Sequence, residues 1–316
     1  MNKTKEHRVI DIKGIGPALA EKLREAGFTS VESIAVTPAR VLAEILGVSE
    51  ARAIKISQNA RELLGIKFMS AEEYYEYRKK ISYISTGCRS LDDMLGGGVE
   101  TGAVTEFVGE FGTGKTQICH QLSVMVQLPA DMGGLEAGAI YIDTEGTFRP
   151  ERIIQIASYR GIEPKKALKN IIYARAYNSD HQILLIDEVR KIIPEKNIRL
   201  LILDSLVGHF RSEYPGREFL AVRQQKLNKH VHQLLEIADI FNIAVVVTNQ
   251  VLSVPDTFFG NPLRPAGGNI VAHGCTYRVW LRKGKDNRRL ARIFDSPSHP
   301  EVEVVFQITE NGVEDV

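Results

Sequence analysis

The chain has 316 residues, of which 44% are hydrophobic and 25% charged, a composition typical of folded globular proteins that excludes a disordered or fibrous one. Its 40 Lys and Arg residues are balanced by 39 Asp and Glu residues, so the net charge of +1 supplies no attraction for nucleic acid, and any such surface must be a local patch. The three cysteines show no CxxC spacing, which argues against a zinc site or a disulfide framework. Because the N-terminus is charged and no apolar run reaches about 18 residues, the sequence predicts a cytoplasmic protein without a membrane partner.

Residues 1–66 predict a small all-α domain of short helices separated by turns. The run IKGIG at 12–16, followed by PALAEKL, fits a helix-hairpin-helix motif. Its glycines, Gly14 and Gly16, let backbone amides at the start of the second helix approach a DNA phosphate. Contacts of this kind carry little base information, so the binding would be largely independent of sequence. A simple turn that joins two helices fits the same residues.

Residues 67–82 are charged and aromatic, show no obvious core face, and are interpreted as a linker. The linker contains Phe68 followed by the small residue Ala71 three positions later. Such an isolated Phe can dock into a pocket on another protein. Composition alone favours the alternative, in which Phe68 packs against its own N-terminal domain.

Residues 83–316 predict an α/β domain with a mainly parallel sheet, because continuous apolar strands alternate with helices. The expected strands are 103–108, 139–143, 171–174, 199–204 and 243–248, and the helices between them include 115–127, 150–159 and 218–241. The tail is expected to add three strands without helices, in antiparallel arrangement, at 276–283, 290–294 and 302–308.

The run GEFGTGKT fits the phosphate-binding pattern G-x-x-x-x-G-K-[ST] and lies between an expected strand and an expected helix. Its glycines let backbone N–H groups face the phosphates of ATP, Lys115 can reach the β and γ oxygens, and Thr116 can hold Mg²⁺. The residues expected to contact the nucleotide are Gly109, Glu110, Phe111, Gly112, Thr113, Gly114, Lys115, Thr116 and Gln117.

A P-loop ATPase also needs polar groups at the ends of neighbouring strands. Asp204 ends the strand RLLILD and is placed to hold Mg²⁺ together with Thr116. Glu145 follows the strand AIYID and can orient or deprotonate the attacking water, although an exposed loop Glu fits equally well. Gln250 ends another strand, where its amide can sense the γ-phosphate or simply form a strand-end hydrogen bond.

Four strings of the chain, in this order, resemble the archaeal RadA recombinases of the RecA family, whose close relatives include the eukaryotic strand-exchange recombinases: ISTGCRSLDDMLGGGVE, GEFGTGKTQICHQLSV, YIDTEGTFRPERI and VTNQV. The resemblance covers essentially the whole chain. It implies ATP- and Mg²⁺-dependent strand exchange between single- and double-stranded DNA, for recombination and repair at an archaeal nucleoid. It also implies self-assembly into helical filaments or rings, with recombination mediators as further partners.

The resemblance assigns roles to individual residues. It implies that Glu145 is the catalytic carboxylate, that Gln250 couples the γ-phosphate to DNA, and that Arg152 stacks on the adenine. Helix-hairpin-helix domains in this position of the family bind DNA. The linker Phe-x-x-Ala motif of the family inserts into the next protomer, which implies that Phe68 and Ala71 enter a pocket around Ala174 and Ala176.

Two segments are candidate DNA loops. Arg211, Arg217 and Arg223 surround a Pro-Gly turn and suit a mobile loop that contacts phosphates, or else a solvated helix face. The second segment, 251–268, is long and rich in Gly and Pro and is expected to be disordered without a ligand. Val254 stands there where relatives of the resembled family commonly have Lys, Arg or Gln, which weakens the case for a direct phosphate contact.

Two features leave their roles open. His273 could report the γ-phosphate across a subunit interface or be structural, and the segment from Asp295 to Pro300 resembles the family's cap over the neighbouring nucleotide. Two other functions fit the same core: a mediator that neither polymerises nor exchanges strands, and a ring-forming motor. The Phe-x-x-Ala linker, Glu145 and the N-terminal domain together favour the recombinase.

Overall fold

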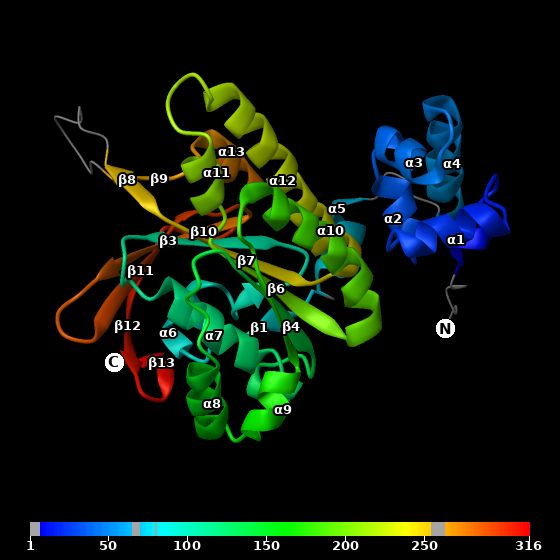
Figure 1. The fold of residues 1–316 in the computed structure, drawn as a ribbon. Coiled ribbons are helices and arrows are strands. Elements are labelled where there is room, and N and C mark those ends of the chain that lie inside the picture. Colours follow the sequence, from blue (N-terminus) through cyan, green and yellow to red (C-terminus); the bar gives the residue numbers. More distant parts are fainter. Residues whose placement is uncertain (1–6, 65–69, 80, 254–262) are drawn as a thin grey trace. The chain divides into compact units, whose positions relative to one another are not determined.

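The structure is a computed structural model that describes residues 7–64, 70–79, 81–253 and 263–316 (Figure 1). The chain forms two compact units. The N-terminal unit comprises Met1–Lys80 with Asp187–Lys196, and the sheet unit comprises Ile81–Ile186 with Asn197–Val316. Each unit has its own cluster of buried apolar side chains.

The N-terminal unit is helical, as the sequence predicts. Its core contains the fully buried side chains of Leu23, Ile34 and Leu42. A left-handed Gly47 (φ 65°) ends one helix, and the Ser49 side chain accepts the N–H of Arg52 at the start of the next. Its elements are η1 (Val9–Asp11), α1 (Pro17–Glu25), α2 (Val31–Val36), α3 (Ala39–Leu46), α4 (Glu50–Leu64) and α5 (Ala71–Arg78).

Helix α5 lies inside the segment interpreted from sequence as a linker. Ser70 begins it with a capping box, in which its hydroxyl accepts the N–H of Glu73 and the Glu73 carboxylate accepts the N–H of Ser70. None of its residues is buried, which agrees with the absence of an apolar face in the sequence. The Ser-x-x-Glu pattern at Ser70 and Glu73 could have predicted this helix, whereas hydrophobic periodicity could not.

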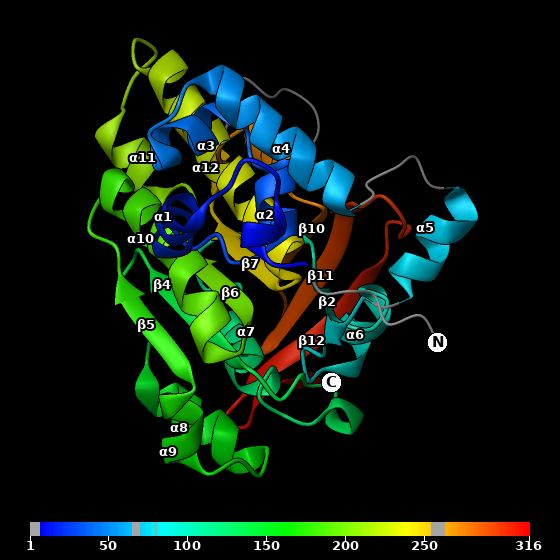
Figure 2. The same ribbon diagram turned by 90° about the vertical axis from the view of Figure 1, so that its right-hand side faces the viewer.

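The sheet unit is built on nine strands in the order β13-β12-β11-β10-β3-β7-β6-β4-β5, counted over the part of the chain that the structure describes. Figure 2 shows β5 at one edge of this sheet, with β11 and β12 toward the other. The strands are β3 (Val104–Gly109), β4 (Gly138–Asp143), β5 (Ile171–Arg175), β6 (Ile198–Asp204), β7 (Ala244–Asn249), β10 (Tyr277–Lys283), β11 (Arg288–Asp295), β12 (Glu303–Thr309) and β13 (Gly312–Asp315).

The α/β class with a mainly parallel sheet is confirmed, and the arrangement of the tail is corrected in one respect. Strand β10 pairs in parallel with β3, so the parallel part of the sheet extends from β5 to β10. The antiparallel part begins only at β11 and includes β13, which the sequence analysis did not anticipate. Two short pairs, β1 (Tyr83–Ile84) with β2 (Val99–Glu100) and β8 (Val251–Ser253) with β9 (Leu263–Pro265), lie outside this sheet.

Helices cover both faces of the sheet, as continuous apolar strands require. Figure 1 shows α10, α11 and α12 on one face and α7, α8 and α9 on the other. Since parallel strands end at the same edge, the residues that follow β3, β4, β6 and β7 meet there. The helices are α6 (Arg89–Met94), α7 (Lys115–Met125), η2 (Ala130–Met132), α8 (Pro150–Tyr159), α9 (Pro164–Lys169), α10 (Ser179–Lys196), α11 (Gly208–Glu213), α12 (Leu220–Phe241) and α13 (Asn269–Gly274).

Candidate functional site

The loop between β3 and α7 is shaped by its glycines. Gly112 (φ 74°) and Gly114 (φ 104°) adopt left-handed conformations that other residues rarely accept. A Cβ on Gly109 would lie 2.4 Å from the carbonyl oxygen of Leu281, so β3 and β10 approach too closely there for any side chain. Gly114 caps α7, whose first amides have no carbonyl one turn earlier to bond. The first amides of α7 are therefore available to a ligand beside this loop.

Lys115 lies over this loop. Its Nζ donates to the carbonyl oxygens of Gly109 and Glu110, each at 2.9 Å. Burial lowers the pKa of Lys115, while the carboxylates of Asp204 and Glu145 act in the opposite direction. The side chain is thus partly removed from water, and the two carboxylates that favour its charged form follow β6 and β4.

Asp204, at the end of β6, faces the first turn of α7. The Thr116 hydroxyl and the Tyr141 hydroxyl each donate to its Oδ2 at 2.8 Å, and the Thr248 hydroxyl donates to its Oδ1. Three hydroxyl groups therefore fix the rotation of a carboxylate that is 2% exposed.

Glu145 meets two groups from the neighbouring strand ends. Its Oε1 accepts hydrogen bonds from the Ser205 hydroxyl at 3.0 Å and from the Gln250 amide at 2.9 Å. These residues follow β4, β6 and β7, so the parallel sheet brings together three positions separated by up to 105 residues. Both Glu145 and Gln250 are solvent-exposed, as groups that meet a ligand must be.

A cleft of about 750 Å³ extends from this point along α7 and the start of α8. Arg152 lies in it, where its guanidinium donates to Gln117 Oε1 at 2.8 Å and to the carbonyl oxygens of Thr309 and Glu310. Phe111 is 92% exposed at its rim. The predicted residues that line the cleft are Phe111, Gly112, Gly114, Lys115, Thr116, Gln117, Glu145, Arg152 and Asp204. The lining also includes Thr147, Arg149, Gln155, Asn287, Arg289, Ile308, Thr309 and Glu310, which the sequence analysis did not single out.

Four predicted residues lie outside this lining. Gly109 and Thr113 are buried in the base of the loop, and Glu110 is exposed beside it. Gln250 lines a second hollow of about 480 Å³ together with Glu145 and Arg211. Glu145 is therefore shared between the cleft and the hollow.

The cleft fits a nucleoside triphosphate with Mg²⁺. Its amides and Lys115 suit phosphate oxygens, while Thr116 and Asp204 suit a hard cation. Within the described residues there is no group of three or more His, Cys, Asp or Glu side chains that could hold a metal alone. This donor set suits Mg²⁺, which takes most of its ligands from phosphates and water.

The predicted DNA-contacting arginines lie on two helices and the turn between them. Arg211 is on α11, Arg217 is exposed in the turn, and Arg223 on α12 donates to the Tyr214 carbonyl at 3.0 Å. In the second candidate loop, the ends pair as β8 and β9, and Val254 lies outside the described residues. His273 is exposed on α13, and Asp295 ends β11 with a carboxylate oxygen 3.9 Å from the Arg278 guanidinium.

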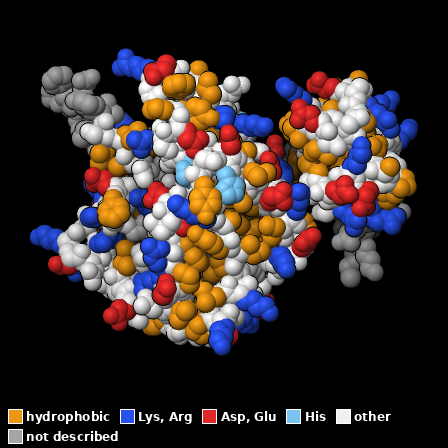
Figure 3. All heavy atoms as spheres, viewed as in Figure 1, with side chains coloured by type: hydrophobic (Ala, Val, Ile, Leu, Met, Phe, Trp, Pro, Cys, Tyr) orange, Lys and Arg blue, Asp and Glu red, His pale blue; other side chains and the backbone are white. Residues whose placement is uncertain are grey.

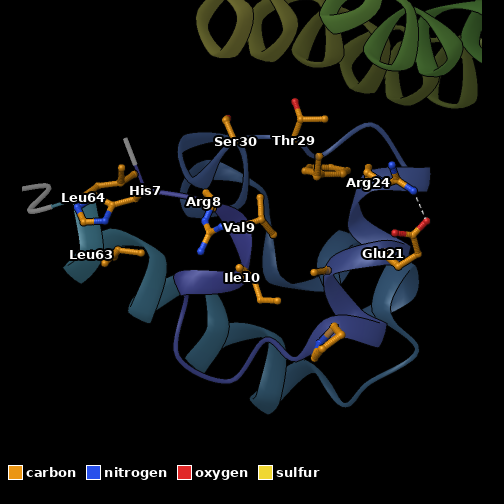
Figure 4. Close-up of a pocket in the computed structure, with 13 residues that line it drawn as sticks. His7, Arg8, Val9, Ile10, Glu21, Arg24, Thr29, Ser30, Leu63 and Leu64 are labelled. Carbon is orange, nitrogen blue, oxygen red and sulfur yellow. Dashed lines mark hydrogen bonds and ion pairs between the residues drawn. The ribbon is translucent and has the colours of Figure 1, made fainter. Parts of the chain in front are cut away.

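In the N-terminal unit, Gly14 (φ 98°) and Gly16 alternate with the buried Ile12 and Ile15, and Gly16 caps α1. A Cβ on Gly16 would meet nothing within 4 Å, so this backbone is open to a ligand. A separate groove of about 1030 Å³ is drawn in Figure 4, which shows Arg24 bonded to Glu21 at its edge. The two glycines are not among the residues that line this groove.

Comparison with protein-family models shows the family of the chain. Residues 77–316 match the model of the Rad51 family. The chain belongs to the Rad51 family. Residues 6–62 match the SAM-like helix-hairpin-helix tandem, in agreement with the motif predicted at 12–16. Together the two matches indicate a RecA/Rad51-type recombinase with an N-terminal helix-hairpin-helix domain.

Rad51-family proteins are DNA-dependent ATPases that bind ATP with Mg²⁺.

The polymerisation residues predicted for this member are distributed as follows. Phe68 lies outside the described residues, and Ala71 begins α5. Ala174 is half-buried in β5, and Ala176, the first residue after this strand, is buried.

No helix among the described residues has the length and apolar character needed to cross a membrane.

The residues that hold the site in place were not predicted from the sequence. His120 on α7 accepts the N–H of Arg149 at Nε2 (3.0 Å) and bonds the Thr116 carbonyl at Nδ1 (2.7 Å), so it ties the two halves of the cleft together. Burial lowers the pKa of His120, and the neutral ring can accept at one nitrogen while it donates at the other. Tyr141 and Asp143 act at the end of β4, and both stand in the YIDTEG string that drew attention to Glu145.

Proposed function

We propose that this Rad51-family protein is an archaeal RadA-type recombinase, which exchanges DNA strands as an ATP-dependent filament on single-stranded DNA. The observation that carries the proposal is the convergence of Glu145, Ser205 and Gln250 beside the phosphate loop. A mediator would need the nucleotide fold but not this hydrolytic arrangement.

The residues of the cleft divide the chemistry of hydrolysis among them. Lys115 and the loop amides neutralise the phosphates of ATP, and Thr116 and Asp204 hold Mg²⁺, which supplies charge stabilisation at the reacting phosphoryl group. Glu145 orients the attacking water and accepts its proton. Arg152 lies at the far end of the cleft, where its planar guanidinium suits the adenine ring.

Gln250 provides the route to DNA. It bonds Glu145 through its side chain, while its backbone carbonyl accepts the N–H of Ala266 at the far end of the β8–β9 segment. A change at the γ-phosphate therefore reaches both stems of the segment proposed to contact DNA. Arg211 lines the same hollow, and the turn and helix that follow it carry Arg217 and, on α12, Arg223.

Self-assembly would use the edge of the sheet. Figure 3 shows apolar side chains gathered on one face of the sheet unit. Tyr173 in β5, Tyr177 just after it and Leu184 in α10 are exposed large hydrophobic residues. Strand β5 ends the sheet and carries Ala174, followed by Ala176. Insertion of Phe68 and Ala71 from a neighbouring protomer would cover this edge, and head-to-tail contacts of this kind build helices.

The test compares Glu145→Gln with Lys115→Ala. We expect Glu145→Gln to bind ATP and single-stranded DNA and to form filaments visible by electron microscopy, while hydrolysis falls by about 10²–10⁴-fold through loss of the general base. Lys115→Ala should lose ATP binding itself and form no ATP-dependent filaments. Unchanged hydrolysis in Glu145→Gln would remove this residue from the mechanism, and a parent protein that forms no filaments would favour a mediator.

A further inference from the structure

The loop that carries Glu145 is closed on a single buried carboxylate. Asp143, the last residue of β4, is fully buried, and its Oδ1 accepts the backbone N–H groups of Glu145 (3.0 Å), Gly146 (2.7 Å) and Thr147 (3.3 Å). Its Oδ2 accepts the N–H of Phe148 at 3.2 Å. Four successive amides therefore point at one side chain, which fixes the backbone on which Glu145 stands.

The charged state of Asp143 suits this role. Burial raises the pKa of this carboxyl, but the hydrogen bonds from the four amides outweigh burial and hold the pKa below its ordinary value. The carboxylate is thus ionised throughout the pH range in which an ATPase works, and each amide bond to it is charge-assisted.

Two side chains from the edge strand complete the cluster. Arg175 donates from Nη1 to Asp143 Oδ1 at 3.1 Å and to its backbone carbonyl at 3.2 Å, and Tyr173 donates from its hydroxyl to Oδ2 at 3.2 Å. A Cβ on Gly146 would lie 3.4 Å from the Arg175 guanidinium, so the arginine also packs against the loop. In register, Arg175 pairs directly with Asp143 across β4 and β5.

We propose that Arg175 and Tyr173 are positioning residues for Glu145: through Asp143 they hold the catalytic loop in register with the edge strand β5. The proposal rests on the function proposed above for Glu145. Tyr173 and Arg175 lie on one face of β5, and Ala174 and Ala176 alternate with them toward the other. A protomer that docks on β5 therefore acts on the same strand that holds the catalytic loop.

Arg175→Ala should lower kcat for ATP hydrolysis by about 10- to 100-fold, because a displacement of about 1 Å at the reacting groups costs this much. The KM for ATP should stay within about twofold, since Lys115 and the phosphate loop are untouched. Arg175→Lys should recover part of kcat because it keeps a cation beside Asp143. Tyr173→Phe removes one hydroxyl from the same carboxylate and should lower kcat less. Arg282→Ala, which removes an arginine from the exposed ion pair with Glu303 on other strands, is the matched control and should change neither parameter.

A second measurement separates positioning from simple loss of stability. Amide hydrogen exchange, measured well below the unfolding temperature, should be faster at residues 145–148 in Arg175→Ala than in the parent protein, with the rest of the sheet unchanged. In the parent protein, protection of these amides should rise with protein concentration as protomers associate, and Arg175→Ala should lose this response.

Two outcomes would overturn the proposal: exchange at 145–148 that is the same in Arg175→Ala and the parent protein, or a fall in kcat that Arg282→Ala reproduces. Protection that does not depend on protein concentration would overturn the link to docking. Failure of the proposed function would look different, because Glu145→Gln would then still hydrolyse ATP.

Discussion

Tyr141→Phe tests the magnesium site through a residue that sequence analysis did not assign. The hydroxyl is one of three that donate to Asp204, and the ring is fixed against His120 and Phe148 at centroid distances of 5.6 and 4.8 Å. Phenylalanine keeps the ring and removes only the donor. A hydrogen bond to a charged group contributes about 1.5–3 kcal/mol, and loss of such an outer partner weakens metal binding by about 10–100-fold.

The sign of the effect depends on which of two consequences is larger. Without the hydroxyl, the Asp204 carboxylate gains electron density, which favours a cation. It also loses one of the two hydroxyl groups that hold its Oδ2, the other being that of Thr116. We expect the loss of orientation to dominate, because the coordination geometry of Mg²⁺ is strict.

The assay is ATP hydrolysis as a function of Mg²⁺ concentration. Tyr141→Phe should raise the Mg²⁺ concentration for half-maximal hydrolysis by about 10-fold or more, with kcat at saturating Mg²⁺ nearly restored. Tyr159→Phe, which alters an exposed tyrosine on α8, should match the parent protein. An unchanged or lower Mg²⁺ requirement in Tyr141→Phe would refute the reasoning.

Three further predictions concern DNA binding and stability. Arg217→Ala should reduce the salt slope of single-stranded DNA affinity by about 0.7, whatever the sequence, in anisotropy titrations; an unchanged slope means that Arg217 contacts no phosphate. Burial lowers the pKa of His230 to about 4, so the unfolded chain takes up a proton first as the pH falls. The free energy of unfolding should therefore fall by about 3 kcal/mol between pH 6.5 and 4, and urea titrations of His230→Gln should lack this contribution. Glu106→Gln leaves the buried Arg278 guanidinium without its counter-ion and should cost about 3–5 kcal/mol of stability by urea unfolding, whereas a loss below 1 kcal/mol would show that water or Asp295 replaces it.

Much of the geometry of the candidate nucleotide site could be predicted because its residues follow directly after apolar strands. The phosphate loop is one continuous run, and Asp204 and Gln250 each stand at or next to a strand end. A parallel sheet places such positions at one edge whatever their separation in sequence. The fold class follows from the same alternation of apolar strands and helices.

The support of the site could not be predicted, because it depends on strand pairing. Asp143 is a strand-end aspartate like Asp204, and only the folded structure shows that its carboxylate accepts the loop amides of residues 145–148 and the Arg175 guanidinium. The parallel pairing of β10 with β3 joins segments more than 160 residues apart and leaves no local periodicity. The tail strands pair antiparallel with one another as expected, and only the additional parallel pairing of β10 with β3 was not anticipated.

The geometry at Glu145 gives a physical link between hydrolysis and DNA binding in the function we propose. Both hydrogen bonds to this side chain, from Ser205 and Gln250, end on Oε1, and no other described residue donates to Oε2. One carboxylate oxygen is therefore held while the other remains able to accept a proton from water. The backbone carbonyl of Gln250 also accepts the N–H of Ala266, just after β9. A movement of the β8–β9 segment would therefore change the hydrogen bond from the Gln250 amide to Glu145 Oε1. Asp143 fixes the other end of Glu145, its backbone, so a movement at Gln250 turns the carboxylate without displacing the loop. In the function we propose, the same side chain would respond to DNA through Gln250 and keep its place beside the phosphates through Asp143.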